Sequence, residues 1–106
     1  MRRRTLRLSD LAVEQLADLE THITEAAGSE IAERYVGSIV EFCEGLSDYP
    51  YRTHRVEGFP HDMRTIGFRR RVQLLFILDD ELLQLVAVYY GGQDWRSKAR
   101  QTFGIG

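Results

Sequence analysis

The sequence predicts an α+β fold, in which an antiparallel sheet has an N-terminal strand and a helical hairpin packed on one face. Two observations predict it. Near the start, two long segments repeat apolar residues at helical spacing, and the second half holds apolar runs rich in β-branched and aromatic residues. At 106 residues the chain is expected to form one domain with a single core, in the order β-α-α-β-β-β followed by a short tail.

The first half predicts one strand and two helices. Residues 3–8 alternate between apolar and polar side chains, which is typical of a strand. Ser9 is a suitable cap for an amphipathic helix over residues 10–27, and Gly28 is expected to end this helix in a left-handed conformation. A second amphipathic helix begins at Ser29 and continues until the Tyr-Pro-Tyr sequence that starts at residue 49.

The second half predicts a loop and three strands. Residues 51–62 contain glycine and proline and are expected to be a connecting loop. Strands then occupy most of residues 63–90, and a two-residue turn at Asp80-Glu81 sets the pairing of the last two strands. That turn pairs Asp79 with Leu82, Leu78 with Leu83, and Phe76 with Leu85.

Side chains alternate between the two faces of a strand, so this pairing assigns residues to faces. One face is expected to carry Leu74, Phe76, Leu78, Leu83, Leu85 and Ala87. The other is expected to carry Gln73, Leu75, Ile77, Gln84, Val86 and Val88. A sheet with one solvated face would alternate between apolar and polar residues, and this one does not. The second face must therefore be covered, either by the chain itself or by a partner.

Composition and charge restrict the class of protein. The net charge is −2, but residues 8–50 hold ten acidic residues against one basic residue, whereas residues 51–106 hold nine basic against six acidic. This segregation suggests an electropositive face suited to an acidic partner or nucleic acid, or simply a solvated acidic helical surface. The single cysteine, Cys43, excludes an internal disulfide, and no apolar run spans a membrane or forms a signal peptide. We expect a cytoplasmic protein.

No cofactor or metal is expected. His22, His54 and His61 are far apart in the sequence without the spacing of metal ligands, and Cys43 falls in a helical apolar stripe. Gly91-Gly92 is more typical of a strand end than of a phosphate-binding loop. These residues give no support for a metal centre or a nucleophilic catalytic site.

Several segments, in their order and spacing, resemble the ParE branch of the RelE/ParE toxins of bacterial toxin–antitoxin systems. The resemblance covers nearly the whole chain and rests on these pieces: Arg7-Leu8-Ser9, Ala17-Asp18-Leu19, Ala32-Glu33-Arg34-Tyr35, Leu46-Ser47-Asp48-Tyr49-Pro50, Met63-Arg64, Gly67-Phe68 and Tyr90-Gly91-Gly92-Gln93-Asp94. It implies the RelE/ParE-like fold and a toxin neutralised by a ParD-like antitoxin, in a heterotetramer or larger complex. The antitoxin would then cover the second sheet face and contact Leu75, Ile77, Gln84, Val86 and Val88.

The resemblance implies two possible activities. RelE-like toxins cleave messenger RNA on the ribosome with arginines, lysines and an acid–base residue. Here Gln73 and Gln93 occupy positions where those nucleases place arginines, so catalysis is disfavoured. ParE-like toxins are instead implied to bind DNA gyrase and to block replication, with DNA contacted only indirectly. ParE relatives usually end the last strand with a His-Gly-Arg-Arg-Asp-like run, and Tyr90-Gly91-Gly92-Gln93-Asp94 lacks its histidine and arginines.

Candidate residues for target binding are basic or aromatic. They are Arg64, Arg69, Arg70, Arg71, Tyr90, Trp95, Arg96, Lys98 and Arg100. Each also has a plain structural explanation. The arginine run at residues 69–71 could be a solubilising turn, Arg64 could pack against an acid, and Trp95 could close the edge of the sheet. The favoured function is a gyrase-binding toxin; a RelE-type ribonuclease and a non-toxic relative that only regulates its operon are the alternatives.

Overall fold

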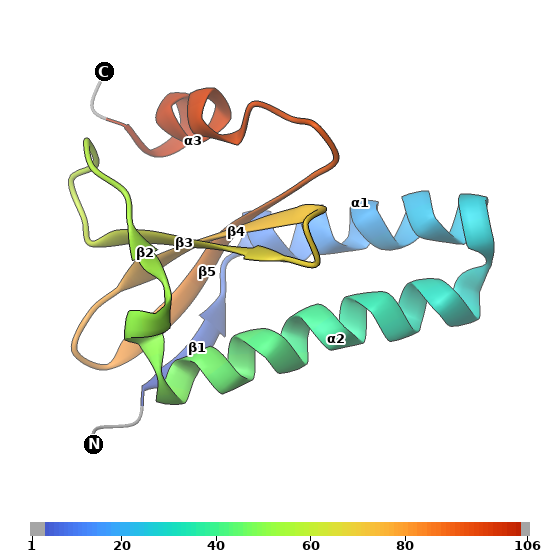
Figure 1. Ribbon diagram of the computed structural model, residues 1–106, viewed down its shortest axis with the longest axis horizontal. Coiled ribbons are helices and arrows are strands. Elements are labelled where there is room, and N and C mark those ends of the chain that lie inside the picture. Colours follow the sequence, from blue (N-terminus) through green and yellow to red (C-terminus); the bar gives the residue numbers. More distant parts are fainter. Residues whose placement is uncertain (1–3, 105–106) are drawn as a thin grey trace.

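The computed structural model describes residues 4–104 (Figure 1). Its elements are β1 (Thr5–Leu8), α1 (Asp10–Ala27), α2 (Ser29–Asp48), the short 3-10 helix η1 (Pro50–Arg52), β2 (His54–Arg55), β3 (Met63–Phe68), β4 (Val72–Leu78), β5 (Leu82–Tyr90) and α3 (Trp95–Phe103). The predicted order of strands and helices is confirmed. The short strand β2 lies inside the segment that was expected to be a loop.

The five strands form one sheet in the order β1-β5-β4-β3-β2. Strands β2 to β5 pair antiparallel, as predicted, but β1 pairs parallel to β5, with Thr5 opposite Leu82 and Leu8 opposite Leu85. The sheet is therefore mixed rather than antiparallel. The helical hairpin supplies the long connection that a parallel pair needs. Arg3, the predicted first residue of the strand, lies outside the described residues.

Local capping explains where the two long helices begin and end. The Ser9 hydroxyl accepts a hydrogen bond from the backbone N–H of Ala12 at 3.1 Å, as expected of an N-terminal cap. Gly28 ends α1 with a φ of 97° and a ψ of 158°. Its φ is positive, as predicted, but its ψ is extended rather than left-handed helical. That conformation, which favours glycine, lets α2 begin at once and fold back along α1.

The helical hairpin covers one face of the sheet (Figure 1). The core beneath it consists of buried side chains from both layers: Ala12, Leu16, Leu19, Ile39, Cys43, Leu46, Phe68, Val72, Leu74, Phe76, Leu78, Leu83, Leu85 and Val88. Phe76 on the central strand is fully buried. The apolar stripes predicted for the two helices thus find the sheet surface that they need.

A β-bulge changes the predicted assignment of residues to faces. The turn register is correct, since Leu78 pairs with Leu83 and Phe76 with Leu85, but Leu75 then pairs with Ala87. The extra residue on β5 reverses the alternation beyond it. As a result Val88 packs under the helices, and Ala87 lies on the opposite face. Both were predicted on the other side, and both assignments are wrong.

Helix α1 satisfies the backbone of β5 beyond the end of β1. The hydroxyl of Ser9 donates to the carbonyl oxygen of Val86 at 3.2 Å, and the Gln15 side-chain oxygen accepts from the backbone N–H of Val88 at 2.6 Å. These groups would otherwise lie beside the helix without a strand partner, which is costly in a half-buried position. The contacts hold the bulged segment of β5 against α1.

The second sheet face is covered by the chain itself. A second cluster buries Met63, Leu75, Val86, Ala87, Tyr89 and Ala99, with Leu11, Val56, Phe59, Ile77, Trp95 and Phe103 packed against it. Ala99, Trp95 and Phe103 belong to α3, which crosses the sheet on the side opposite the helical hairpin (Figure 1). Of the two possibilities for this face, cover by the chain itself is the one observed for the residues of this cluster.

The buried thiol of Cys43 makes stability depend on alkaline pH. Burial, with a smaller contribution from the neighbouring Glu44 carboxylate, raises the pKa of Cys43 from 9.0 to about 12. Between these values the unfolded chain loses the proton while the folded chain keeps it. The free energy of unfolding is therefore expected to fall by about 1 kcal/mol per pH unit in this range.

Denaturant unfolding of the native chain and Cys43→Ala at several pH values measures this effect. Other groups that titrate there are common to both proteins, so the difference between the two curves isolates Cys43. If the free energies of unfolding of the two proteins ran parallel against pH above pH 9, the raised pKa of Cys43 would be contradicted.

Candidate functional site

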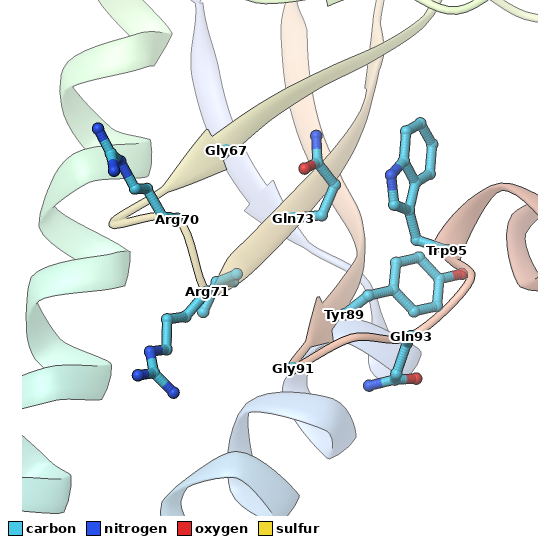
Figure 2. A pocket seen from close by; sticks show the side chains of 9 residues that line it. Gly67, Arg70, Arg71, Gln73, Tyr89, Gly91, Gln93 and Trp95 are labelled. Carbon is cyan, nitrogen blue, oxygen red and sulfur yellow. The ribbon is translucent and has the colours of Figure 1, made fainter.

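A small hollow of about 120 Å³ lies where β3, β4 and β5 reach the start of α3 (Figure 2). It is lined by Gly67, Arg70, Arg71, Val72, Gln73, Tyr89, Gly91, Gln93 and Trp95. The fold brings together five residues that the sequence singled out for chemistry or target binding, namely Arg70, Arg71, Gln73, Gln93 and Trp95. This is the position at which a catalytic site would be expected.

Both glutamines in this hollow are engaged in internal hydrogen bonds. The Gln73 amide donates to the Thr65 hydroxyl at 2.6 Å, and that hydroxyl donates to the Leu74 carbonyl oxygen at 2.8 Å. The Gln93 amide nitrogen donates to the Tyr90 carbonyl oxygen at 2.7 Å, while its oxygen accepts from Lys98 at 2.8 Å. These bonds hold both amides in structural roles and leave the Lys98 ammonium paired with an amide.

The ionisable groups around the hollow do not converge on a common point. In Figure 2 the guanidinium groups of Arg70 and Arg71 extend away from Gln73 and Trp95. Burial raises the pKa of Tyr89, so its phenol keeps its proton more firmly and the phenolate that could act as a base is less available. A phosphoryl-transfer site needs a positioned acid or base and fixed positive charge at the reacting group. The hollow provides neither arrangement.

The arginine turn between β3 and β4 has an unusual backbone. Arg69 and Arg70 have φ values of 48° and 61°, a region that glycine and asparagine occupy more readily than arginine. The Arg69 guanidinium lies over the rings of Tyr35 and Phe68, at 5.6 Å and 4.9 Å from their centroids. These contacts fix one arginine against α2, while Arg70 and Arg71 are exposed.

Arg64 has a structural role. Its Nε atom lies 3.1 Å from an Asp62 carboxylate oxygen, and another of its nitrogens donates to the Thr53 carbonyl oxygen at 3.2 Å. Its guanidinium also lies 5.0 Å from the ring centroid of Tyr51. Of the two roles considered for Arg64, packing against an acid is the one observed.

The C-terminal candidates are carried by α3, which Asp94 caps by accepting from the N–H of Ser97 at 3.3 Å. Trp95 is half-buried against the second sheet face, with Arg96 stacked over its ring at 4.6 Å from the centroid. Arg96 and Arg100 also line a hollow of about 270 Å³ beside β2. The sequence did not predict that hollow, because β2 has two residues and no strand signal.

Tyr90 lies on the other side of the sheet. Its ring is 5.5 Å from that of His22, and both line a mostly apolar hollow of about 330 Å³ near the tip of the helical hairpin. Arg71 reaches the rim of the same hollow. Tyr90 is therefore separated from Trp95 and the other C-terminal candidates. No sequence signal connected Tyr90 with His22.

The residues predicted to bind an antitoxin divide into two groups. Leu75, Val86 and Val88 are at most 4% exposed in the chain alone, the first two on the second face and the last under the helices. Ile77 and Gln84 are half-buried and face each other across β4 and β5. Only these two remain reachable on the second face without moving α3.

Metal-ligand groups and membrane-spanning helices are both absent among the described residues. Within residues 4–104, histidine, cysteine and acidic side chains form no group of three that could hold a metal ion. In the same range, no helix combines the length and apolar character required to cross a membrane.

Replacing Arg70 by glycine is expected to raise the free energy of unfolding by about 1 kcal/mol, since glycine adopts positive φ without the clash of a side chain. Arg71→Gly is the matched control, because Arg71 is equally exposed but has no positive φ. Denaturant unfolding of both variants checks this. A destabilised Arg70→Gly protein would show that the turn is not strained.

Comparison with known proteins shows which family this chain is related to, which the geometry of the hollows alone does not. The sequence model of the ParE toxin of the type II toxin–antitoxin system parDE matches residues 6–95. Two solved structures share the fold. One is described as the chromosomal ParDE toxin–antitoxin system from P. aeruginosa, with a TM-score of 0.71, 22% identity, and coverage of 82% of this chain and 95% of that chain.

The other is the E. coli DinJ-YafQ toxin–antitoxin complex, with a TM-score of 0.53, 12% identity, and coverage of 84% of this chain and 93% of that chain. The comparison with curated proteins gave no match. The family match spans most of the chain, from β1 to the start of α3. This chain belongs to the ParE toxin family of type II toxin–antitoxin systems.

Proposed function

We propose that this ParE-type toxin inhibits DNA gyrase by binding to it, and that a ParD-like antitoxin neutralises the toxin. The observation that carries the proposal is the family match over residues 6–95. The hydrogen bonds in the small hollow of Figure 2 support a binding mechanism. Gln73 and Gln93 are engaged in internal hydrogen bonds there, at positions where a nuclease would need free cations. ParE toxins are generally binding proteins rather than enzymes.

The exposed basic and aromatic groups offer a surface for the target. Arg70 and Arg71 project from the strained turn, and Arg96 is stacked on Trp95 at the start of α3. Aromatic residues and arginine dominate the energetics of protein interfaces. A strained turn maintained with arginine, where glycine would relieve it, is more readily explained by a contact with a partner than by stability.

Purified toxin is expected to reduce supercoiling by gyrase and to increase the amount of cleaved DNA trapped on the enzyme. Because the small hollow in Figure 2 holds no assembled acid–base pair among residues 4–104, the toxin is expected to leave messenger RNA intact on programmed ribosomes. Both assays use the same toxin preparation. Cut messages together with normal supercoiling would overturn the proposal in favour of the RelE-type activity.

For the antitoxin we propose contact at the uncovered end of the second sheet face, around Ile77 and Gln84. Ile77 is half-buried although it belongs to the apolar cluster under α3, and Gln84 pairs with Arg7 on β1 as well as with Ile77 on β4. A partner segment docking there would complete the burial of Ile77. Contact at Leu75 or Val86 would additionally require α3 to move.

Ile77→Glu is expected to weaken antitoxin binding at least about tenfold, since it places a charge at the centre of the proposed contact. Isothermal titration with the cognate antitoxin measures this, and circular dichroism checks that the variant is folded. Val13→Glu is the matched control, because Val13 is 53% exposed on α1. Wild-type affinity for Ile77→Glu would move the antitoxin to another surface.

A further inference from the structure

The hollow between β2 and α3 is rich in basic side chains. It has a volume of about 270 Å³ and is lined by His54, Arg55, Val56, Glu57, Phe59, Thr65, Arg96 and Arg100. Three arginines and one histidine thus line the hollow, together with a single acidic residue, Glu57. The three arginines come from different places in the sequence, one from β2 and two from α3.

These arginines have no acidic partner within residues 4–104. The ion pairs found there join Arg34 to Glu30 and Arg64 to Asp62. Arg96 and Arg100 are four positions apart on one helix, and like charges at that spacing destabilise a helix by a few tenths of a kcal/mol. The fold therefore concentrates positive charge around one recess without neutralising it. An external anion would relieve this repulsion.

The recess is held in a fixed shape. Arg96 is stacked over the ring of Trp95, which packs on the second sheet face, so its guanidinium loses little freedom on binding. The Thr65 hydroxyl on the recess wall already donates to Leu74 and accepts from Gln73. The hydrogen bonds of this hydroxyl are thus already made within the chain, and the arginines supply the attraction.

The surroundings favour a polyanion with regularly repeated charges. Thr65 lines this recess, and Gly67 lines the neighbouring hollow that contains Trp95, Arg70 and Arg71. Thr65 and Gly67 are two positions apart on β3, on the same face and about 7 Å from each other. A backbone leaving the arginine recess along β3 would next meet the hollow that Arg70 and Arg71 line, so basic side chains recur along this strand as they do on nucleic-acid surfaces.

An acidic peptide fits this surface less well. Peptide recognition depends on apolar anchors in pockets, and the apolar lining of this recess is limited to Val56 and Phe59, which are already half-buried against the second sheet face. The recess thus presents more charged than apolar side chains. We propose that Arg55, Arg96 and Arg100 bind the phosphodiester backbone of DNA directly. This contact is a property of the toxin alone and does not depend on gyrase.

Fluorescence anisotropy with a short labelled DNA, as a duplex and as a single strand, tests the proposal. With three phosphate contacts, the logarithm of the association constant is expected to fall with the logarithm of salt concentration with a slope of about −3 for duplex DNA and about −2 for a single strand. Each single arginine-to-alanine substitution is expected to weaken binding and to reduce the steepness of that slope by about 1. The variant in which Arg55, Arg96 and Arg100 are all replaced by alanine should lose the salt-dependent binding.

Arg34→Ala is the matched control. It removes one arginine from the opposite, acidic side of the molecule, where Arg34 is paired with Glu30. Affinity should be unchanged in this variant if the recess, rather than net charge, binds DNA. All four arginines are exposed, so the variants are expected to fold, which Trp95 fluorescence and circular dichroism verify.

Three outcomes would overturn the proposal. The triple variant could bind DNA as tightly as the native chain, Arg34→Ala could weaken binding as much as a recess variant, or polyglutamate could compete as effectively as unlabelled DNA. The last result would assign the recess to an acidic polypeptide. Gyrase inhibition is measured separately, so either proposal can fail while the other holds.

Discussion

The fold depends on burying both faces of one sheet. Strands β4 and β5 carry apolar side chains on each side, and neither face could remain in water without exposing a large apolar surface. The hairpin of α1 and α2 covers one face, and the much shorter α3 packs on the other together with Val56 and Phe59 of the segment between η1 and β3. The central strands are therefore enclosed like those of a three-layer protein, although the third layer is a single helix of nine residues.

This arrangement separates the chemistry of the two sides. The acidic residues are concentrated in the segment that forms α1 and α2, whereas arginines gather on β2, the β3–β4 turn and α3. The side that carries α3 thus combines the basic recess, Trp95 and the uncovered end around Ile77. A toxin that acts by binding needs such surfaces more than it needs an enclosed pocket, and the small central hollow with its bonded glutamines is consistent with that.

Sequence reasoning predicted the helices well because their apolar periodicity, Ser9 cap and Gly28 break all agree. It also predicted the β4–β5 turn register. It missed the bulge, because Val86, Ala87 and Val88 are all apolar and no alternation reveals which way each points. Nothing in the local sequence of β1 indicated that this strand pairs parallel to β5. The covering role of α3 was missed because this segment was considered for its basic residues and Trp95, whereas Ala99, which is fully buried, was given no role.

The central claim is that α3 covers the second sheet face of the free toxin. Trp95, the single tryptophan of the chain, lies in that contact and reports on it through its fluorescence. Ala99→Asp would bury a carboxylate without a partner and lift α3. The account predicts a shift of Trp95 emission to longer wavelength while circular dichroism shows that α1 and α2 remain folded. Unchanged emission in a folded Ala99→Asp protein would contradict it.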